Sequence, residues 1–446
     1  MSSLYSGNSG NVSIASTIQV TLPSDGDARN VASVNVCDQK QSDYLEAFRQ
    51  MFAGSGLPIS EGFETSVPPA SPLNAWAVPS KNFGSDSVWA RSTTNPIAGT
   101  ASASAPVPQT ASTNSSLGLT VAFVSPARIS FLFALNCNNN NGDHLDFYVD
   151  GVLTAQLSTV TSNTLVGGRF VSDLLREGLH TFDWRFVRGG SASVGSEECK
   201  IDTVEIISDL VWQNDATRVY FMDEGFPPPQ QNLSAGADLI IPPWFYTTGA
   251  NAGSIIRSGG GLPGLGVVTL RVPPTAAGDF SIGTFSFPSG AAPNGGLTAA
   301  KLPFVEGRLG TSTALNVNLV FGVGLGDSNG PATENFIGWA WDGSNGAGSN
   351  FRWRASNAGA QVNADSGVAG VFNTLFRLGV TVATVRGVTG AVFTKDGKAL
   401  PGAGSVPPLI ATGLPANFSP TYRVRSITAA AAGNVDLDWL RVMMLR

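Results

Sequence analysis

Histidines are the first residues to consider for chemistry near neutral pH. The 446 residues contain two of them, His144 and His180, and neither lies in a Gly-x-Ser-x-Gly elbow or a His-x-x-x-His pair. Those spacings are typical of nucleophilic and zinc-dependent hydrolases. His180 stands at the entry to an apparent strand, where we expect a structural role. The pattern therefore predicts no catalytic triad.

Paired carboxylates would permit glycoside hydrolysis if two of them faced one cleft. Glu197-Glu198 and Asp223-Glu224 are adjacent in sequence, so on strands the two side chains of each pair would point to opposite faces. Pairing between strands could still bring Asp146, Asp183 or Asp342 together. We interpret the protein as not an enzyme, with a polysaccharide depolymerase as a lesser alternative.

One segment offers oxygen ligands at short spacing. From Asn138 to Asp146 the sequence reads NNNNGDHLD, and Asn141, Asp143 and Asp146 are the candidate metal ligands. The segment lacks the alternation and closing Glu of an EF-hand, and Asn-Gly is itself a turn signal. Two alternatives follow, a calcium site or a plain polar loop, and no other cofactor is predicted.

Large aromatic residues alternate with small or basic ones in two neighbouring segments. The first reads Trp339-Ala-Trp341-Asp342-Gly and the second Phe351-Arg352-Trp353-Arg354. Alternation places Trp339 and Trp341 on one face of a strand. If that face points outward, Trp341, Asp342, Arg352 and Trp353 would form a platform for a glycan or a protein. If it points inward, the rings are sandwich core.

Composition excludes several classes of protein. Charged residues make up 13% of the chain and the net charge is −6, against roughly 25% charged residues in average soluble domains. No basic cluster is present, so we expect no nucleic-acid partner. The apolar runs fall short of the roughly 20 residues that span a bilayer. The start of the sequence lacks the features of a secretory signal peptide, and three unpaired cysteines suit a reducing compartment.

The amino-terminal segment, residues 1–56, differs from the rest. Its first part alternates small, polar and β-branched residues, which predicts an extended arm with one or two short strands. The next part predicts an amphipathic helix of about four turns. Its apolar residues recur at three- and four-residue steps, and we expect them to form an assembly surface. These residues are Tyr44, Leu45, Phe48, Met51 and Phe52.

After residue 56 the pattern is that of short strands. Asp150-Gly151 lies between two apolar runs, which is a strong signal for a two-residue β-hairpin. The second half repeats this plan with Asp396-Gly397, and each half closes with an alternating strand, at Ile201–Ile206 and Leu437–Val442. The predicted fold is mainly β, with two jelly-roll-like β-sandwich domains at 57–210 and 211–446. Further strands are predicted at Thr120–Val124, Ile129–Leu135, Leu145–Val149 and Thr181–Val187.

Three stretches resemble known families. Val20–Asn35 followed by Gln41–Phe52 resembles an amino-terminal segment of structural proteins of tailed bacteriophages. Phe147–Asp150 with Gly178–Trp184 is similar to jelly-roll modules of extracellular and viral proteins, although Lys200 stands where those modules have an aromatic residue. The last half resembles concanavalin- or laminin-G-type sandwiches, at Trp341-Asp342-Gly343 and Asp438-Trp439.

The resemblance implies a structural protein of the virion, made in the host cytoplasm. It would decorate or cement the capsid, or form a fibre or appendage. Expected partners are further copies of the chain, as a trimer in preference to a dimer, and the major capsid, tail or portal proteins. The alternative is a receptor-binding, lectin-like protein that recognises host surface glycans through Trp341 and Trp353.

Overall fold

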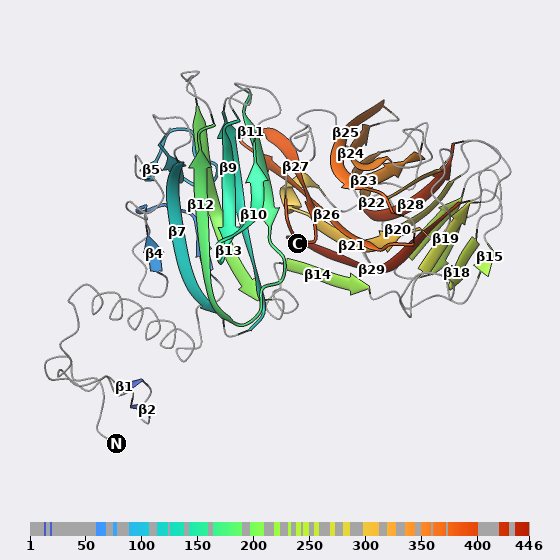
Figure 1. Ribbon diagram of the computed structural model, residues 1–446, viewed down its shortest axis with the longest axis horizontal. Coiled ribbons are helices and arrows are strands. Elements are labelled where there is room, and N and C mark those ends of the chain that lie inside the picture. Colours follow the sequence, from blue (N-terminus) through green and yellow to red (C-terminus); the bar gives the residue numbers. More distant parts are fainter. Residues whose placement is uncertain are drawn as a thin grey trace, which may run out of the picture.

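The computed structural model is a mainly-β protein, as predicted (Figure 1). The predicted helix at Gln41–Phe52, with its five apolar residues, lies outside the described residues. Within the described residues, no helix has the length and hydropathy needed to cross a bilayer. The structure describes residues 13–14, 18–19, 59–67, 75–77, 89–106, 114–123, 125–137, 142–158, 164–189, 197–208, 218–223, 231–232, 238–241, 244–248, 254–257, 268–272, 280–285, 298–311, 319–326, 335–343, 349–357, 360–371, 373–399, 419–427 and 433–445.

The first sandwich consists of two antiparallel sheets. Sheet I has the strand order β10-β9-β12-β7-β4, and sheet II has the order β11-β8-β13-β6-β5, with β3 pairing with β13. A separate pair of strands, β1 (Ser13–Ile14) and β2 (Ile18–Gln19), precedes them. The strands of the sandwich are β3 (Ile59–Glu61), β4 (Ala75–Ala77), β5 (Ala90–Ser92), β6 (Ser102–Ala105), β7 (Asn114–Phe123), β8 (Ala127–Asn136), β9 (His144–Val149), β10 (Val152–Leu157), β11 (Val166–Val171), β12 (Gly178–Val187) and β13 (Glu198–Ser208).

The second sandwich consists of two larger antiparallel sheets. Sheet III has the order β15-β18-β19-β29-β21-β26-β27, with β14 pairing with β29, and sheet IV has the order β16-β17-β20-β28-β22-β23-β24-β25. A short 3-10 turn, η2 (Ala299–Lys301), precedes β21. The strands are β14 (Arg218–Asp223), β15 (Gln231–Asn232), β16 (Asp238–Ile241), β17 (Trp244–Thr248), β18 (Ser254–Arg257), β19 (Val268–Val272), β20 (Phe280–Phe285), β21 (Phe304–Gly310), β22 (Leu319–Gly326), β23 (Phe336–Asp342), β24 (Asn350–Asn357), β25 (Ala360–Ala369), β26 (Phe376–Val385), β27 (Val388–Lys395), β28 (Ser419–Ser426) and β29 (Gly433–Leu445).

Alternation along the strands fills the first core with aromatic rings. On β12, Phe182, Trp184 and Phe186 are buried, while the residues between them are more exposed. The centroid of the Trp184 ring lies 5.1 Å from that of Phe147 on β9 and 5.7 Å from that of Phe131 on β8. Rings from both sheets therefore meet between them, and ring pairs at such distances add to the stability gained by burial.

The Asp150-Gly151 hairpin is confirmed. Strands β9 and β10 pair antiparallel through Val149 and Val152, and the backbones of Asp150 and Gly151 have φ angles of 51° and 76°. Two positive φ angles in a two-residue loop give the twist that an antiparallel pair requires. Register along this hairpin fixes which side chains of sheet I face outward.

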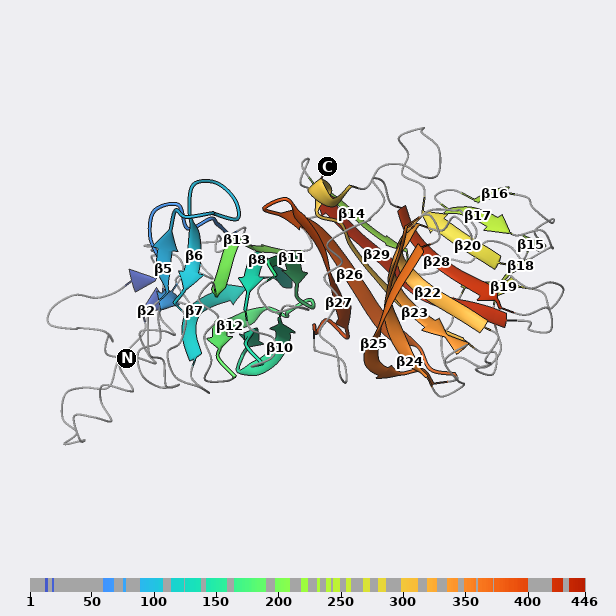
Figure 2. The same ribbon diagram turned by 90° about the horizontal axis from the view of Figure 1, so that it is seen from above.

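Strands of the two sandwiches pack directly against one another. In Figure 2, β26 and β27 of the second sandwich face β11 of the first. Val392 of β27 belongs to the hydrophobic cluster of the first sandwich. A methyl group at Gly167 on β11 would lie 2.5 Å from the Cβ of Val385, so only glycine permits this close approach. The two cores are therefore joined by an apolar contact.

Candidate functional site

The structure places both predicted docking tryptophans in the core of the second sandwich. Trp341 is 0% exposed and Trp353 is 1% exposed. Asp342 is buried and pairs with Arg354, whose Nη2 lies 2.7 Å from its Oδ2, and Arg352 is half-buried. The rings therefore offer no docking face to a ligand, because alternation along β23 and β24 turns them toward sheet III.

The three candidate calcium ligands do not form one site in the described residues. Asn141 lies outside the described residues. Asp143 is buried, and its Oδ1 accepts a hydrogen bond from the Gly189 N–H at 2.9 Å. Asp146 lies on β9 and is held by other side chains. Among the residues that the structure describes, no group of three His, Cys, Asp or Glu side chains could hold a metal ion.

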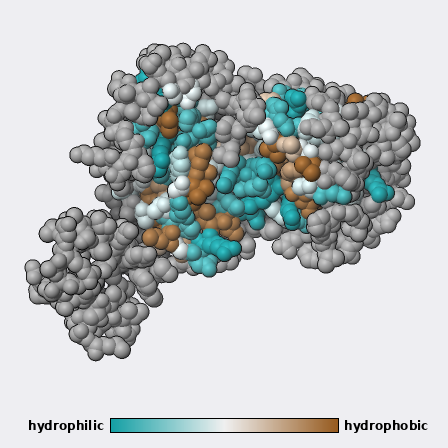
Figure 3. All heavy atoms as spheres, in the orientation of Figure 1, coloured by the Kyte–Doolittle hydropathy of each residue, from teal (hydrophilic) through white to brown (hydrophobic). Residues whose placement is uncertain are grey.

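The outer face of sheet I carries a compact set of polar side chains. The binding ridge, as we name it, takes alternate residues from β9 and β12 and one residue from β10. Cross-strand register sets Asp183 opposite Tyr148 and Arg185 opposite Asp146, and Asp146 opposite Gln156. Figure 3 shows hydrophilic and hydrophobic patches side by side on this face. The binding ridge comprises His144, Asp146, Tyr148, Gln156, Asp183 and Arg185.

Hydrogen bonds within the binding ridge fix the side chain of Asp146. Its Oδ2 accepts from the hydroxyl of Tyr148 at 3.2 Å, and its Oδ1 accepts from Nε2 of Gln156 at 3.1 Å. The same Oδ1 lies 3.4 Å from Nε2 of His144. Three neighbours thus hold one carboxylate, which keeps Tyr148 and Gln156 in a set geometry.

Arg185 contacts ridge residues on two neighbouring strands, β9 and β12. Its Nε donates to Oδ2 of Asp183 at 2.6 Å, and its guanidinium carbon lies 4.1 Å from the centroid of the Tyr148 ring. Both Arg185 and Asp183 keep 17% of their side-chain surface exposed. The other oxygen of Asp183, Oδ1, is buried and accepts no hydrogen bond in the described part of the chain. The ridge therefore contains an acceptor that the described residues leave unsatisfied.

Burial and neighbouring charges shift three pKa values in the ridge. Burial raises the pKa of Asp183 above its usual range, against the opposing hydrogen bond from Arg185. Burial together with the charge of Asp146 raises the pKa of Tyr148. Burial lowers the pKa of His144, but the hydrogen bond and charge of Asp146 outweigh it, so the net pKa is raised. Burial is therefore the largest cause of the raised pKa values of Tyr148 and Asp183.

Small residues on β7 lie beside the longer side chains of β12. Ser116 pairs with Arg185, Gly118 with Asp183 and Thr120 with Thr181. Side chains of paired residues share one face of the sheet. Gly118 and Thr120 are partly exposed, whereas Ser116 is fully buried, so the part of β7 that a ligand could reach lies beside Asp183 and not beside Arg185.

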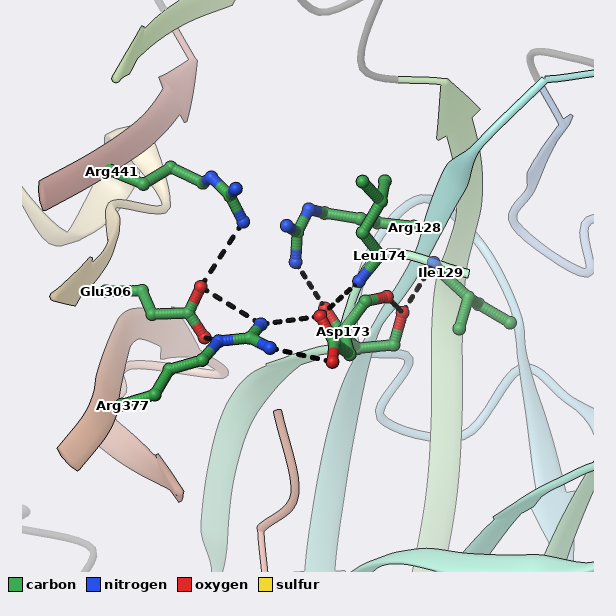
Figure 4. Close-up of polar contacts among 8 residues, drawn as sticks. Arg128, Ile129, Asp173, Leu174, Glu306, Arg377 and Arg441 are labelled. Carbon is green, nitrogen blue, oxygen red and sulfur yellow. Dashed lines mark hydrogen bonds and ion pairs between the residues drawn. The ribbon is translucent and has the colours of Figure 1, made fainter. Parts of the chain in front are cut away.

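A second cluster of charges joins the two sandwiches (Figure 4). Arg377 on β26 donates to both carboxylate oxygens of Asp173, at 2.8 and 2.5 Å. It also donates from Nε to Oε1 of Glu306 on β21 at 2.9 Å. Arg441 on β29 lies 3.3 Å from Oε2 of the same glutamate, whose side chain is 1% exposed. We name these four residues the junction clamp.

The junction clamp shifts the pKa values of its members in opposite directions. Burial raises the pKa of Asp173, but the hydrogen bond and charge of Arg377 outweigh it, so the net pKa lies below the usual range. Burial lowers the pKa of Arg377, and the interactions with Asp173 and Glu306 more than reverse this. Both groups are therefore held in their charged forms, and the cluster acts as a structural joint.

The sequence pointed to Asp146 and Asp183 as candidate site residues, but it did not predict that they lie in one cluster with the other residues of the binding ridge. Asp146 entered as a calcium ligand, and both carboxylates were considered as residues that strand pairing could bring together. They do lie on neighbouring strands of one face, whereas Asp342 lies in the other sandwich. The missed residues were Tyr148, Gln156 and Arg185. Polar alternation in His-Leu-Asp-Phe-Tyr-Val and Thr-Phe-Asp-Trp-Arg was the available signal.

Comparisons with known proteins give no family. No family model matches the chain, and no curated protein matches it. Similar solved structures include a protein of unknown function from Shewanella oneidensis MR-1, with 13% identity over 51% of this chain and 87% of that chain and a TM-score of 0.33. The K1 cleaved adhesin domain of Lys-gingipain from Porphyromonas gingivalis W83 is 15% identical. The match covers 34% of this chain and 99% of that chain, with a TM-score of 0.25.

A third similar structure covers more of the chain. The amino-terminal CBM22-1–CBM22-2 tandem domain of Xyn10C from Paenibacillus barcinonensis covers 87% of this chain and 97% of its own, at 8% identity and a TM-score of 0.24. Scores this low support no argument about function. The chain is thus a mainly-β protein of two β-sandwiches whose family is not shown.

Proposed function

We propose that the protein is a non-catalytic, carbohydrate-binding protein that holds a glycan on the outer face of sheet I. The observation that carries the proposal is the binding ridge itself, an aromatic ring, two carboxylates, an amide and a guanidinium held together on the outer, partly exposed face of sheet I. Aromatic rings pack against the apolar faces of sugars, while carboxylates and amides accept and donate the hydrogen bonds of hydroxyl groups.

Arg185 and Asp183 would change partners when a sugar binds. A cation over an aromatic ring at an exposed site contributes only about 0.5–1 kcal/mol, so a sugar face can replace the guanidinium above Tyr148. Movement of Arg185 would also break its 2.6 Å hydrogen bond to Oδ2 of Asp183. Both oxygens of that carboxylate would then need partners, because Oδ1 accepts no hydrogen bond in the described residues. A sugar hydroxyl would then satisfy that acceptor, and hydrogen bonds to charged groups contribute about 1.5–3 kcal/mol.

Removal of the Tyr148 ring tests the proposal. We expect the wild-type protein to bind a subset of an array of bacterial surface glycans, and Tyr148→Ala to weaken that binding about tenfold or more, since tenfold is about 1.4 kcal/mol. Val371→Ala is the control, because Val371 is an exposed apolar residue on the second sandwich. No binding by the wild-type protein, or equal loss in both variants, would refute the proposal. Release of new reducing ends from a bound polysaccharide would instead indicate a depolymerase.

The pH dependence of binding gives a further prediction. A sugar hydroxyl donates to the ionised form of Asp183, whose pKa is raised above its ordinary value of 3.8. Affinity should therefore be full above the raised pKa and fall as the pH drops through it. Asp183→Asn should remove this dependence and weaken binding about tenfold at neutral pH. Calorimetric titrations of both proteins between pH 4 and 7 check this, and an unchanged acid limb in the variant would contradict it.

The virion hypothesis remains a prediction from the sequence. Its attachment segment, residues 1–56, lies almost entirely outside the described residues. The assignment of the first sandwich to the jelly-roll type and of the second to the concanavalin or laminin-G type also remains a proposal. A glycan-binding protein carried on a virion would satisfy both hypotheses, with the first sandwich recognising a host surface glycan and residues 1–56 providing attachment.

A further inference from the structure

The tip of one hairpin of the second sandwich reaches the first sandwich. Strand β27 ends at Lys395, and Asp396 and Gly397 follow with φ angles of 52° and 73°. Lys395 and Lys398 then exchange two backbone hydrogen bonds, at 2.9 and 3.0 Å. The two-residue turn predicted from Asp-Gly is therefore present, and it delivers Ala399 to the neighbouring sandwich.

Ala399 extends sheet I at its edge. It forms a parallel bridge with Ala155 of β10. The N–H of Gln156 donates to the carbonyl of Ala399 at 2.7 Å, and the N–H of Ala399 donates to the carbonyl of Thr154 at 2.9 Å. Ala399 is fully buried and belongs to the hydrophobic cluster of the first sandwich. Edge strands present unpaired backbone groups, and here the second sandwich pairs those of β10.

Gln156 connects this backbone contact to the binding ridge. Its main chain is fixed by Ala399 and its side chain donates to Oδ1 of Asp146. Asp146 in turn accepts from the hydroxyl of Tyr148 and lies beside His144. The second sandwich is therefore connected to the Tyr148 hydroxyl of the proposed glycan site through the backbone and side chain of Gln156 and the carboxylate of Asp146.

The same hairpin tip also touches the junction clamp. A methyl group at Gly397 would lie 2.5 Å from the Cβ of Asp173, which is the residue that Arg377 binds with both terminal nitrogens. The tip thus contacts the junction clamp at Gly397 and the edge of sheet I at Ala399. Any displacement of the tip moves Ala399 and with it the backbone of Gln156.

We propose that the second sandwich is a positioning element for the glycan site of the first, acting through the Lys395–Ala399 tip, β10 and Gln156. The inference rests on the proposed function and adds that glycan binding by the first sandwich depends on its contact with the second. Coupling of this kind is carried by contiguous packed and hydrogen-bonded groups, and its usual size is 5- to 150-fold in affinity. Asp146 is the point at which the effect reaches the ligand.

Two glycines with the same backbone geometry provide a matched test. Gly397 and Gly387 each occupy the second position of a two-residue turn, with φ angles of 73° and 79°. A methyl group at Gly397 would meet the first sandwich, whereas one at Gly387 would have no atom of the described residues within 4 Å. The Gly387 turn reaches the first sandwich only through the long side chain of Arg386, which binds Glu198 and which the substitution leaves in place. Gly397→Ala and Gly387→Ala therefore carry the same local strain, and only the first displaces the tip.

His144 reports on the ridge without any glycan. The chain has two histidines, so the ring signals of each can be followed by NMR at one fixed pH. Nε2 of His144 lies 3.4 Å from Oδ1 of Asp146, the same oxygen that accepts from Gln156. If Asp146 is no longer held by Gln156, this contact should change and the ring signals of His144 should shift. His180, which pairs with Asp150 at the other end of β9, serves as the internal reference.

We expect Gly397→Ala to shift the ring signals of His144 and to weaken glycan binding at least about fivefold. Gly387→Ala should change neither. Gln156→Met, which keeps the backbone but removes the amide donor, should shift the ring signals of His144 similarly and keeps the test decisive if Gly397→Ala folds poorly. Wild-type values of both quantities in Gly397→Ala and Gln156→Met, or equal changes in the two glycine variants, would overturn the inference. If the wild type binds no glycan, the proposed function fails, while the ring signals of His144 still decide whether the two sandwiches are coupled.

Discussion

Arg377→Ala is expected to lower the free energy of unfolding by about 3 kcal/mol. The substitution removes the group that lies between Asp173 of the first sandwich and Glu306 of the second. Glu306 is 1% exposed, and an uncompensated buried charge typically costs 3–5 kcal/mol. We place the loss at the lower end because Arg441 still contacts Glu306 and Asp173 is 38% exposed. Denaturant unfolding measures the difference.

Arg308→Ala is the matched control for the junction clamp. Arg308 is paired directly with Arg377 in the register of β21 and β26, but its side chain is 43% exposed and its partner is Asp438. Exposed ion pairs contribute about 0–1 kcal/mol, so this variant should lose little stability. Equal losses in the two variants would contradict the role of the clamp.

The dependence of stability on acid pH tests the same contact between Arg377 and Asp173. The pKa of Asp173 is lowered in the folded state, so the ionised carboxylate stabilises the protein at pH values above its ordinary pKa of 3.8. That contribution should disappear as the pH falls through the lowered value. In Arg377→Ala this part of the acid dependence should be much smaller than in the wild type.

Trp341→Ala is expected to cost about 4 kcal/mol of stability. The ring is fully buried and stacks on Phe321 at a centroid distance of 5.6 Å. Its Nε1 donates to the carbonyl of Ser349 at 3.1 Å. Removing a buried tryptophan leaves a large cavity, and such changes cost 3–5 kcal/mol. Thermal or denaturant unfolding of the variant checks the value.

Trp439→Ala is the control for this prediction. Trp439 lies on the outer face of sheet III, is partly exposed and has the guanidinium of Arg441 5.3 Å from its ring centroid. Truncating a partly exposed ring leaves a smaller cavity, so we expect a loss below about 2 kcal/mol. A fully stable Trp341→Ala protein that had lost glycan binding would instead support the docking role first considered for that ring.

Periodicity in the sequence was enough to predict the fold class and several strands. Alternation over Thr181–Val187 predicted a strand that the structure extends to Gly178–Val187. Asp150-Gly151 predicted a hairpin because a two-residue turn with positive φ angles has few alternative sequences. These signals are local, so neither depends on which strands become neighbours in the sheet.

The site and the junction depend on contacts that local patterns do not encode. Period-2 alternation says which residues share a face, but not whether that face is inside, and so Trp341 and Trp353 were left with two alternatives. Tyr148 and Asp183 become neighbours only through the pairing of β9 with β12. Arg377 and Asp173 are separated by 204 positions. No spacing rule connects residues that meet through the packing of two sandwiches.

A crystal structure of the protein with the tightest-binding oligosaccharide from the glycan array would show whether sheet I holds the glycan. We expect the sugar on the outer face of sheet I, with a ring against Tyr148, a hydroxyl donating to Asp183 and Arg185 displaced from its position in the free protein. A sugar bound elsewhere, with the side chains of the binding ridge unmoved, would contradict this expectation.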